Sequence, residues 1–276
     1  MKDIFSKDRI KHFTKEFIRF GSQPVLSKIK NLKNIHKGES CYIVGDGISL
    51  KYIDFSLLPK KKAIACNYSI FHKEITSLDL LYAINYAPFF FKPQFGVYSK
   101  EQKEVLSITS KLVKNKIDQL DKTNFIFHVS NFPFLLNKNC YYLFDKMPTS
   151  SHDDLKNINS FNNVIQSSIV LAIYLGFTDI NLLGFDYTHS PSRSHHWYEK
   201  GEGVITNVQT PQKNFLLLAK EFADISSVTI NTKAQVINHI FYKDLTGSDP
   251  LFRENIELAP KYFLDAQSIF NDYKIY

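Results

Sequence analysis

The stretch CYIVGDGISL, residues 41–50, limits the possible folds more than any other part of this chain. A short β-branched run is followed directly by Gly45-Asp46-Gly47 and then by Ser49. Glycines allow positive φ and a close approach of the backbone to an anion, and a serine caps helices well. A helix N-terminus adds free N–H groups and a positive dipole end. The pattern predicts a strand, a phosphate-binding loop and a helix, with a plain tight turn as the alternative.

The glycine loop matches neither of the two best-known phosphate-binding motifs. Leu50 stands where the third glycine of GxGxxG would fall, and no GK[ST] follows as it would in a P-loop. We therefore expect a phosphate loop of another type.

Composition and charge narrow the classes of partner. The 276 residues carry a net charge of +7 and are 44% hydrophobic, which is typical of a globular protein long enough for one large α/β domain with an appendage. The positive charge indicates anionic partners such as phosphates, acidic sugars or a membrane surface. We expect no nucleic-acid partner, because no recognition helix dense in Lys and Arg and no zinc finger is visible.

The cysteines point to a reducing compartment. Cys41, Cys66 and Cys140 are odd in number and none lies in CxxC spacing, so no disulfide framework is expected. No signal peptide and no apolar run of 18 or more residues is visible. These features together predict a cytoplasmic protein.

Residues 1–38 are basic and carry apolar residues at helical spacing, among them Ile4, Phe5, Phe13 and Phe17. They predict an amphipathic helix, a break at Gly21–Pro24 and a second short helix. Such a segment either packs on the main domain or attaches the protein to an anionic membrane face.

Strand and helix patterns alternate through the rest of the chain. We expect strands at 41–45, 61–67, 78–85, 124–130 and 179–187, with a further strand beginning the segment 227–235. Helices are expected at 49–57, 100–120, 167–177 and 214–223, and residues 236–276 are expected to be mostly helical. This alternation is typical of parallel βαβ units, and predicts a Rossmann-like α/β fold with a mostly parallel sheet flanked by helices.

This organisation suggests three parts. Residues 1–38 form the basic helical segment, 39–240 the α/β domain that binds a nucleotide-sugar, and 241–276 a helical C-terminal segment. The polar segments 132–160 and 188–210 are interpreted as lids.

Small polar residues follow several predicted strands at their carboxyl ends. Asn67 and Asn85 each close a buried strand, and an amide suits a ribose, a base edge or a sugar hydroxyl. An Asx turn is the alternative for each of them. Asp186 and Thr188 follow in the same way after a later strand. Because open α/β sheets bind ligands beyond the carboxyl ends of their strands, we expect these residues to line one nucleotide pocket.

Ser167 and Ser168 open an apolar helix. Ser167 is interpreted as its N-cap, and the same hydroxyl and N–H groups could instead bind a carboxylate or phosphate.

The segment 184–203, GFDYTHSPSRSHHWYEKGEG, is the richest in chemistry. His195 and His196 are candidate general bases because imidazole titrates near working pH, and Tyr187 and Tyr198 are catalytic candidates beside them. A metal site is the competing interpretation, but adjacent histidines point apart and no third ligand stands at fixed spacing. A plain solvated loop is the other alternative.

The sequence predicts no metal site. It contains no Asp-x-Asp pair, which many nucleotide-sugar transferases use to hold a divalent ion on a diphosphate. Chemistry without a metal or other cofactor, or a different leaving group, is therefore expected.

Four blocks in the same order resemble the bacterial family 42 sialyltransferases. GDGISLKYIDFSLLP (45–59) is similar to their GNGPSLK…IDYSRLP opening, and ACNYSIF (65–71) to their strand ending in Cys-Asn. YAINYAPFFF (82–91) is similar to a Tyr-Asn-Pro-Phe-Phe stretch. QSSIVLAIYLGFTDINLLGFDY (166–187) resembles a helix opened by Ser-Gly, followed by a strand ending in Gly-Ile/Phe-Asp. The same pattern resembles the motility accessory factor flagellin glycosyltransferases and pterin pyrophosphokinase-like proteins.

This resemblance implies a GT-A variant α/β fold and a CMP-activated acidic sugar used without metal. It implies that Gly45–Gly47 line the phosphate of cytidine monophosphate, and that Asn67 and Asn85 contact nucleotide and phosphate. Ser167 and Ser168 would meet the donor's carboxylate or cytidine, and Asp186 would close the strand beneath them.

The chain departs from the family pattern at two places. Thr188 stands where the family has its first phosphate-assisting Tyr, and Thr206 lies near the position of the family's catalytic His. His195 or His196 would then supply the base from an earlier position.

The sequence thus predicts an inverting glycosyltransferase with a nucleotide-sugar donor and a glycan or glycolipid acceptor. We expect it to act in bacterial lipooligosaccharide, O-antigen or capsule synthesis, peripherally on the inner face of the inner membrane, with a homo-oligomer possible. A pyrophosphokinase-like enzyme on the same scaffold and a non-catalytic glycan-binding module are the alternatives.

Overall fold

The structure is a computed structural model, and it describes residues 23–144, 155, 158, 163–207 and 212–276. The first 22 residues, with the predicted N-terminal amphipathic helix, lie outside the described residues, as does most of 145–162. Within the described part, the predicted second helix is present as α2 (Gln23–Ser27) and the 3-10 helix η1 (Lys28–Leu32).

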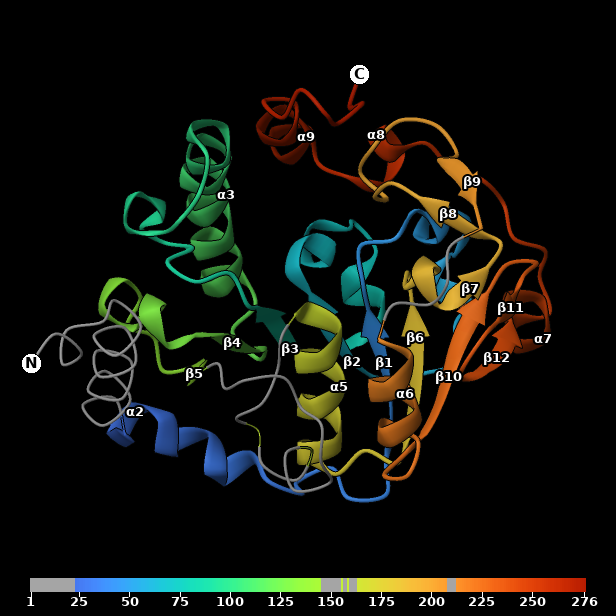
Figure 1. The fold of residues 1–276 in the computed structure, drawn as a ribbon, viewed down its shortest axis with the longest axis horizontal. Helices are drawn as coiled ribbons and strands as arrows, with labels where there is room; N and C mark the ends of the chain where they lie inside the picture. Colours follow the sequence, from blue (N-terminus) through green and yellow to red (C-terminus); the bar gives the residue numbers. More distant parts are fainter. Residues whose placement is uncertain (1–22, 145–154, 156–157, 159–162, 208–211) are drawn as a thin grey trace, which may run out of the picture.

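One eight-stranded sheet forms the centre of the molecule (Figure 1). Its strands, from one edge to the other, are β12 (Asn238–Phe241), β10 (Asp224–Thr229), β6 (Asp179–Leu183), β1 (Ser40–Val44), β2 (Lys62–Cys66), β3 (Asp79–Asn85), β4 (Asn124–His128) and β5 (Cys140–Leu143). Every neighbouring pair in this sheet is parallel. The prediction of a mostly parallel, Rossmann-like α/β sheet is confirmed.

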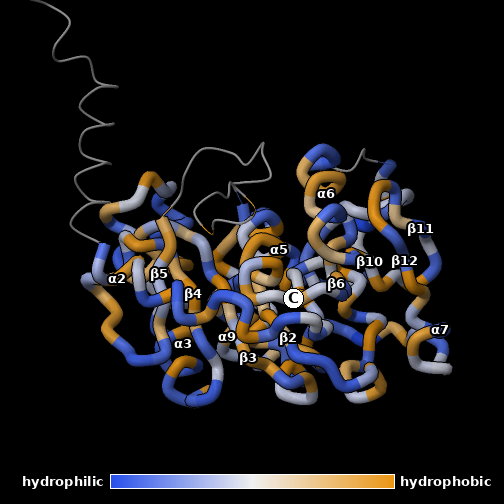
Figure 2. Tube along the Cα trace, turned by 90° about the horizontal axis from the view of Figure 1, so that it is seen from below, coloured by the Kyte–Doolittle hydropathy of each residue, from blue (hydrophilic) through white to orange (hydrophobic). Residues whose placement is uncertain are grey.

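Both faces of the sheet are buried, as a parallel sheet requires. Along β1, alternate side chains point to opposite faces. Cys41 and Ile43 belong to a hydrophobic cluster shared with α5 (Val164–Leu175) and α6 (Lys213–Ala219). Tyr42 and Val44 belong to a second cluster, on the other face, shared with the helices α3 (Lys100–Gln119) and α9 (Lys261–Gln267). Figure 2 shows α5 and α6 on one side of the strands. Central strands such as β1 and β2 are therefore nearly continuous apolar runs.

Short elements connect these layers. They are the 3-10 helices η2 (Ile48–Tyr52), η3 (Phe55–Leu57), η4 (Asn67–Phe71), η5 (Ile75–Ser77), η6 (Pro93–Phe95), η7 (Val129–Phe134) and η8 (Asp186–Thr188), with α7 (Tyr242–Thr246) and α8 (Asn255–Leu258). Two antiparallel ribbons pair β7 (His189–Ser190) with β11 (Lys233–Ala234), and β8 (Ser192–Ser194) with β9 (Val204–Thr206). No helix in the described ranges is long and apolar enough to cross a membrane.

The order of the strands creates a switch point between β1 and β6. From β1 the chain adds β2, β3, β4 and β5 outward in one direction, then returns to place β6 on the other side of β1. The connections that follow β1 and β6 therefore lead to neighbouring strands in opposite directions across the sheet. A crevice opens beyond the carboxyl ends of two such strands, where open α/β sheets bind their ligands.

Several predicted element boundaries were wrong. The helix expected at 49–57 is two 3-10 segments, η2 and η3, and Gly47 rather than Ser49 holds the N-cap position. The segment 132–160, interpreted as a polar lid, contains the edge strand β5 in its described part. Residues 236–276 contain the strand β12 besides three short helices. Both missed strands have four residues, too few to show a periodic pattern.

Helix α5 begins three residues earlier than predicted. Its N-cap is Asn163, whose side-chain oxygen accepts a hydrogen bond from the N–H of Gln166 at 3.1 Å. Ser167 and Ser168 lie inside the helix, and their hydroxyls donate to the carbonyls of Val164 and Ile165, each at 3.0 Å. The N-cap prediction for Ser167 was therefore wrong. Gly176 ends the helix in the left-handed conformation, with φ 99°.

Substituting Asn163 and Ser167 one at a time tests which of the two residues caps α5. Asn163→Ala removes the side-chain acceptor for the first turn and is expected to lower the free energy of unfolding by about 1 kcal/mol. Ser167→Ala loses a bond to a carbonyl that the helix already uses, and is expected to change stability by less than about 0.5 kcal/mol. Urea unfolding at matched pH measures both. A larger loss for Ser167→Ala than for Asn163→Ala would contradict the assignment.

Candidate functional site

A cavity of about 330 Å³ lies at the switch point between β1 and β6. It is lined by residues 45–47 after β1, by Cys66 and Asn67 after β2, by 184–187 after β6, by 192–196 and Thr206 of the β8–β9 ribbon, and by Val164. This volume falls at the lower end of the range for small-molecule sites. The cavity therefore combines the expected topological position with a fitting size.

A larger and more open hollow, of about 820 Å³, lies at the opposite edge of the sheet. Lys61 and Lys62 on its wall are already paired with Asp179 and Glu39. It sits at the amino ends of the strands, where this class of sheet does not bind its ligands. We therefore place the candidate site at the smaller cavity.

The two glycines of the opening motif serve close packing. The N–H of Gly45 donates to the carbonyl of Leu183 at 2.7 Å, and the N–H of Gly47 to that of Gly184 at 2.8 Å. A Cβ at Gly45 or at Gly47 would lie 2.6 Å from the Gly184 oxygen. Neither glycine has positive φ, so the predicted conformational reason was wrong. These positions need glycine because the backbone that follows β6 lies against them.

Asp186 occupies the helix N-terminus that was predicted to be open for a phosphate. The N–H of Ser49, in the first turn of η2, donates to Asp186 Oδ2 at 2.9 Å. Asp186 is 4% exposed, and burial raises its pKa to about 6 against the opposing effect of the Ser49 hydrogen bonds and of Arg193. This N-terminus is thus filled by a side chain of the protein itself.

Asp46, between the two glycines, joins the loop after β1 to the segment 195–203, which we call the site loop. Its carboxylate accepts from the Trp197 indole N–H at 3.3 Å and from the Tyr68 N–H at 3.4 Å. The Trp197 N–H also donates to the Asp46 carbonyl at 3.1 Å. Burial raises the pKa of Asp46 to about 6, opposed by the charge of His196 and by these hydrogen bonds.

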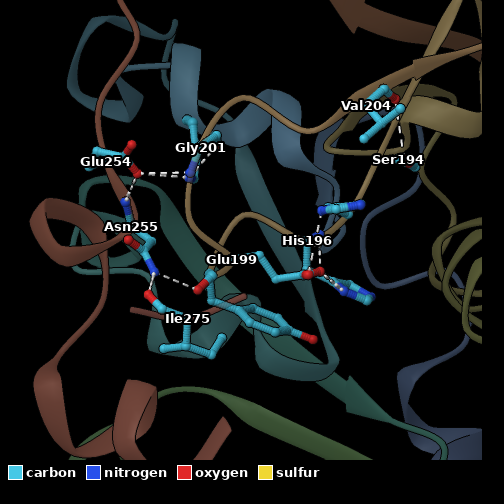
Figure 3. Close-up of polar contacts among 11 residues, drawn as sticks. Ser194, His196, Glu199, Gly201, Val204, Glu254, Asn255 and Ile275 are labelled. Carbon is cyan, nitrogen blue, oxygen red and sulfur yellow. Dashed lines mark hydrogen bonds and ion pairs between the residues drawn. The ribbon is translucent and has the colours of Figure 1, made fainter. Parts of the chain in front are cut away.

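Two histidines share one buried carboxylate on the site loop. Glu199 is 3% exposed; its Oε1 lies 2.9 Å from His196 Nδ1 and also accepts the His196 N–H at 2.8 Å (Figure 3). His195 Nδ1 lies 3.5 Å from the other oxygen, Oε2. His195 has φ 85°, a left-handed conformation rare outside glycine and typical of functional sites. The expectation that these adjacent rings point apart was wrong, since both reach Glu199.

Glu199 remains charged in this setting. Burial acts to raise its pKa, but the hydrogen bonds and charge of His196, with a smaller effect from His195, lower it overall. A charged carboxylate that accepts from His196 Nδ1 fixes the proton on that nitrogen and leaves Nε2 as the basic nitrogen. The His196 ring also stacks on Tyr198, with ring centroids 4.9 Å apart and planes 6° apart.

The C-terminal part of the chain holds the site loop in place. The buried Lys51 ammonium donates to the Gly201 carbonyl at 2.7 Å and pairs with Glu254 at 3.2 Å. Glu254 also accepts the Gly201 N–H at 3.2 Å. The Asn255 amide donates to the carbonyls of Tyr198 at 2.8 Å and Ile275 at 3.0 Å (Figure 3). The loop is thus held at Tyr198 and at Gly201.

The cavity brings together eight of the residues predicted for the site. They are Gly45, Asp46, Gly47, Asn67, Asp186, Tyr187, His195 and His196. Asn67 has φ 47° as the chain leaves β2. Burial raises the pKa of Tyr187 well above its ordinary value, so its hydroxyl stays a proton donor at neutral pH.

The other predicted residues do not line the cavity. Asn85 Oδ1 accepts the Ala87 N–H at 3.1 Å, which is the Asx turn given as its alternative. The Thr188 hydroxyl is buried and donates to the Phe185 carbonyl at 2.8 Å. The remaining four are Ser49, in η2; Ser167 and Ser168, inside α5; and Tyr198, beneath His196.

Sequence reasoning missed Glu199 and Arg193, although both stand in the segment singled out as rich in chemistry. The spacing His196-x-x-Glu199 was the available signal, because a turn of this length returns a carboxylate to the imidazole. Arg193 lines the cavity and pairs with Glu202 at 3.7 Å. Among the residues that the structure describes, no group of three or more His, Cys, Asp or Glu could hold a metal ion.

Comparisons with known proteins give structural similarities alone. The sialyltransferase CstII from Campylobacter jejuni, in complex with a substrate analogue, cytidine-5'-monophosphate, is 16% identical, with a TM-score of 0.46 over 87% of this chain and 92% of that chain. CST-II with a trisaccharide acceptor and CMP is 16% identical, with a TM-score of 0.45 over 86% and 93%. The monofunctional α-2,3-sialyltransferase Cst-I from Campylobacter jejuni is 15% identical, with a TM-score of 0.40 over 84% and 94%.

No protein-family model and no curated protein sequence matches the chain. A shared fold does not transfer an activity, so the function must be supported by the site residues of this chain.

The buried Asp186 predicts a measurable pH dependence of stability. Its pKa is raised from 3.8 to about 6, so between these values the folded protein keeps a proton that the unfolded chain has lost. Stability therefore falls as pH rises through this window, by up to about 1.4 kcal/mol per pH unit. Asp186→Asn removes this contribution and keeps an acceptor for the Ser49 N–H.

The comparison of unfolding free energies from pH 4 to pH 7 tests this expectation. The wild type should lose about 2–3 kcal/mol relative to Asp186→Asn across the range. Asp46 is present in both proteins and cancels. Parallel curves for the two proteins would show that Asp186 does not carry the raised pKa.

Proposed function

We propose that this protein is an inverting, metal-independent glycosyltransferase of the sialyltransferase-like type. It transfers an acidic sugar from a CMP-activated donor to a hydroxyl of a glycan or glycolipid. The observation that carries the proposal is the His196–Glu199 pair on the wall of the cavity at the β1–β6 switch point, 2.9 Å between Nδ1 and Oε1. An oriented imidazole beside a nucleotide-sized cavity is the arrangement that a general base needs.

The cavity supports the donor side of the reaction. Its position is the nucleotide site of open α/β sheets, and the sequence blocks that resemble family 42 sialyltransferases converge on it at 45–47, Asn67 and 186–187. The Asn67 amide and the Tyr187 hydroxyl offer hydrogen bonds to a ribose, base or phosphate. Asp46 and Asp186 are already engaged by protein N–H groups, so they shape the cavity.

The chemistry is a single displacement. His196 Nε2 removes the proton from the acceptor hydroxyl as its oxygen attacks the anomeric carbon of the donor. The bond from that carbon to the phosphate oxygen breaks, and CMP leaves with the bonding electrons. The leaving phosphate carries less charge than a diphosphate would, and protonated Tyr187 and cationic Arg193 on the cavity wall stabilise it. Attack opposite the leaving group inverts the anomeric centre.

The same proposal includes the setting of the reaction. The basic residues 1–38 hold the enzyme peripherally at the cytoplasmic face of the inner membrane. There it extends a bacterial cell-surface glycan such as lipooligosaccharide, O-antigen or capsule.

A thermal-shift panel of CMP-, UDP- and GDP-sugars tests the donor. CMP and CMP-sugars are expected to raise the melting temperature, because a ligand at 100 times its Kd stabilises the fold by about 2.7 kcal/mol. The shift should persist in EDTA and shrink in Asn67→Ala, with Asn85→Ala as the matched control outside the cavity. If no nucleotide shifts the melting temperature, the proposal fails; Mg²⁺-dependent release of AMP from ATP would favour a pyrophosphokinase instead.

Mutation of the histidines tests the base. His196→Ala is expected to slow CMP release from CMP-N-acetylneuraminic acid in the presence of acceptor by about 10²–10⁴-fold. His195→Ala, whose ring lies farther from Glu199, should cost less, and the remote His239→Ala should cost nothing. Glu199→Gln should lower kcat, because the amide no longer holds the proton on His196 Nδ1 by a charge-assisted hydrogen bond. Equal activity in all four variants would contradict the assignment.

A further inference from the structure

A second hollow lies beside the site loop and does not belong to the donor cavity. It measures about 360 Å³ and is lined by Lys200, Ser268, Tyr273, Lys274, Ile275 and Tyr276. One wall comes from the site loop, and the others come from the end of α9 and from the segment 268–276 that follows it. The donor cavity and this hollow have no lining residue in common.

His196 lies at the boundary between the two spaces. It lines the donor cavity, and its ring meets the ring of Tyr273 on the hollow with centroids 5.3 Å apart at 64°. The His196 side chain is 39% exposed, so its ring is open to an incoming group. In a single displacement the attacking hydroxyl approaches from the side opposite the leaving group, and the base meets it there. A hollow that borders His196 outside the donor cavity has the position needed for an acceptor.

The two walls of the hollow are fixed to each other. The Lys200 N–H donates to the Lys274 carbonyl at 2.5 Å. One residue along on the same segment, the Ile275 carbonyl accepts from the Asn255 amide, which also donates to the Tyr198 carbonyl (Figure 3). The hollow therefore exists before any ligand arrives, which lowers the entropy cost of binding.

The charge of the hollow is positive. Lys200 and Lys274 come from paired backbone segments, both are exposed, and within the described residues neither has an ion-pair partner. The nearby Lys261 differs, because it pairs with Asp265 at 2.7 Å. Asp265 is thereby engaged, and it also accepts from the Tyr276 hydroxyl. The acidic groups whose charge acts on Tyr273 are Glu199, Asp46 and Asp272, and none of them lines the hollow. The side chains that line the hollow thus carry two positive charges and no negative one.

We propose that this hollow is the acceptor subsite and that it takes a saccharide bearing a negative charge, a carboxylate or a phosphate. Lys200 and Lys274 bind the anionic group, and the Tyr273 ring packs against the apolar face of the sugar. The acceptor hydroxyl then reaches His196 Nε2, which removes its proton in the displacement described above. This inference rests on the proposed function, because the acceptor is the second substrate of the same transfer.

An NMR titration tests whether the hollow recognises the negative charge of a saccharide or only its shape. The probes are cellobiose and cellobiouronic acid, which differ by one carboxylate, with glucose 6-phosphate as the phosphate arm. In the wild type the acidic disaccharide should bind about tenfold more tightly than cellobiose, and this preference should weaken with salt. Tighter binding of glucose 6-phosphate than of glucose would extend the site to phosphorylated acceptors.

The variants locate the effect. Lys200→Gln/Lys274→Gln should remove the preference for the acidic disaccharide and leave CMP binding unchanged. Lys111→Gln, an exposed lysine on α3, is the matched control and should change neither. Near-equal binding of cellobiose and cellobiouronic acid by the wild type, or a preference that survives the double substitution, would overturn the inference.

The outcome also distinguishes this inference from the proposed function. If CMP binds and the acidic saccharide shows no preference, the acceptor subsite fails while the glycosyltransferase proposal stands. If the acidic saccharide binds at Lys200 and Lys274 but no nucleotide binds the donor cavity, the hollow is a glycan site on a protein that is not a glycosyltransferase.

Discussion

The close contact between the two chain segments that leave β1 and β6 is the constraint on which the site depends. The Gly47 N–H donates to the Gly184 carbonyl, and the Asp186 carboxylate accepts a hydrogen bond from the Ser49 N–H in the first turn of η2. A side chain at Gly47 would collide with both partners. Because these contacts hold the two loops at the switch point, they set the shape of the cavity and the position from which residues 187–203 begin. The opening motif is therefore important as a packing element that shapes a ligand site.

The base is placed by a second set of buried polar contacts. Asp46, in the loop after β1, binds the Trp197 indole, and Glu199 two residues later orients His196. The wall of the donor cavity and the proposed base are thus connected through a few consecutive residues. A buried polar group with its partners satisfied has one preferred geometry, so His196 is pre-organised relative to the donor cavity.

The local order of apolar and polar residues was enough to predict the sheet, but it predicted the site only in part. Strands such as β1 and β6 are apolar on both faces and bounded by glycine or proline, so their period and type are readable. A polar residue such as Ser167 or Asn85 fits both a ligand contact and a local backbone hydrogen bond, and the sequence does not show which one wins. The His196-x-x-Glu199 spacing is visible in the sequence, but the burial of Glu199 depends on tertiary contacts of the site loop that the sequence does not show.

The fastening of the site loop by Asn255 and Ile275 has a consequence for how the protein is made. The sheet that shapes the donor cavity is complete once β12 has left the ribosome, whereas the segment 255–275 is synthesised later. Until it docks, the carbonyl of Tyr198 lacks its amide partner, and the site loop keeps only its contacts with earlier residues, among them Asp46 and Lys51. On the function proposed above, nucleotide binding would precede transfer competence during biosynthesis, and cleavage near residue 255 would yield a protein that binds the donor without transferring its sugar.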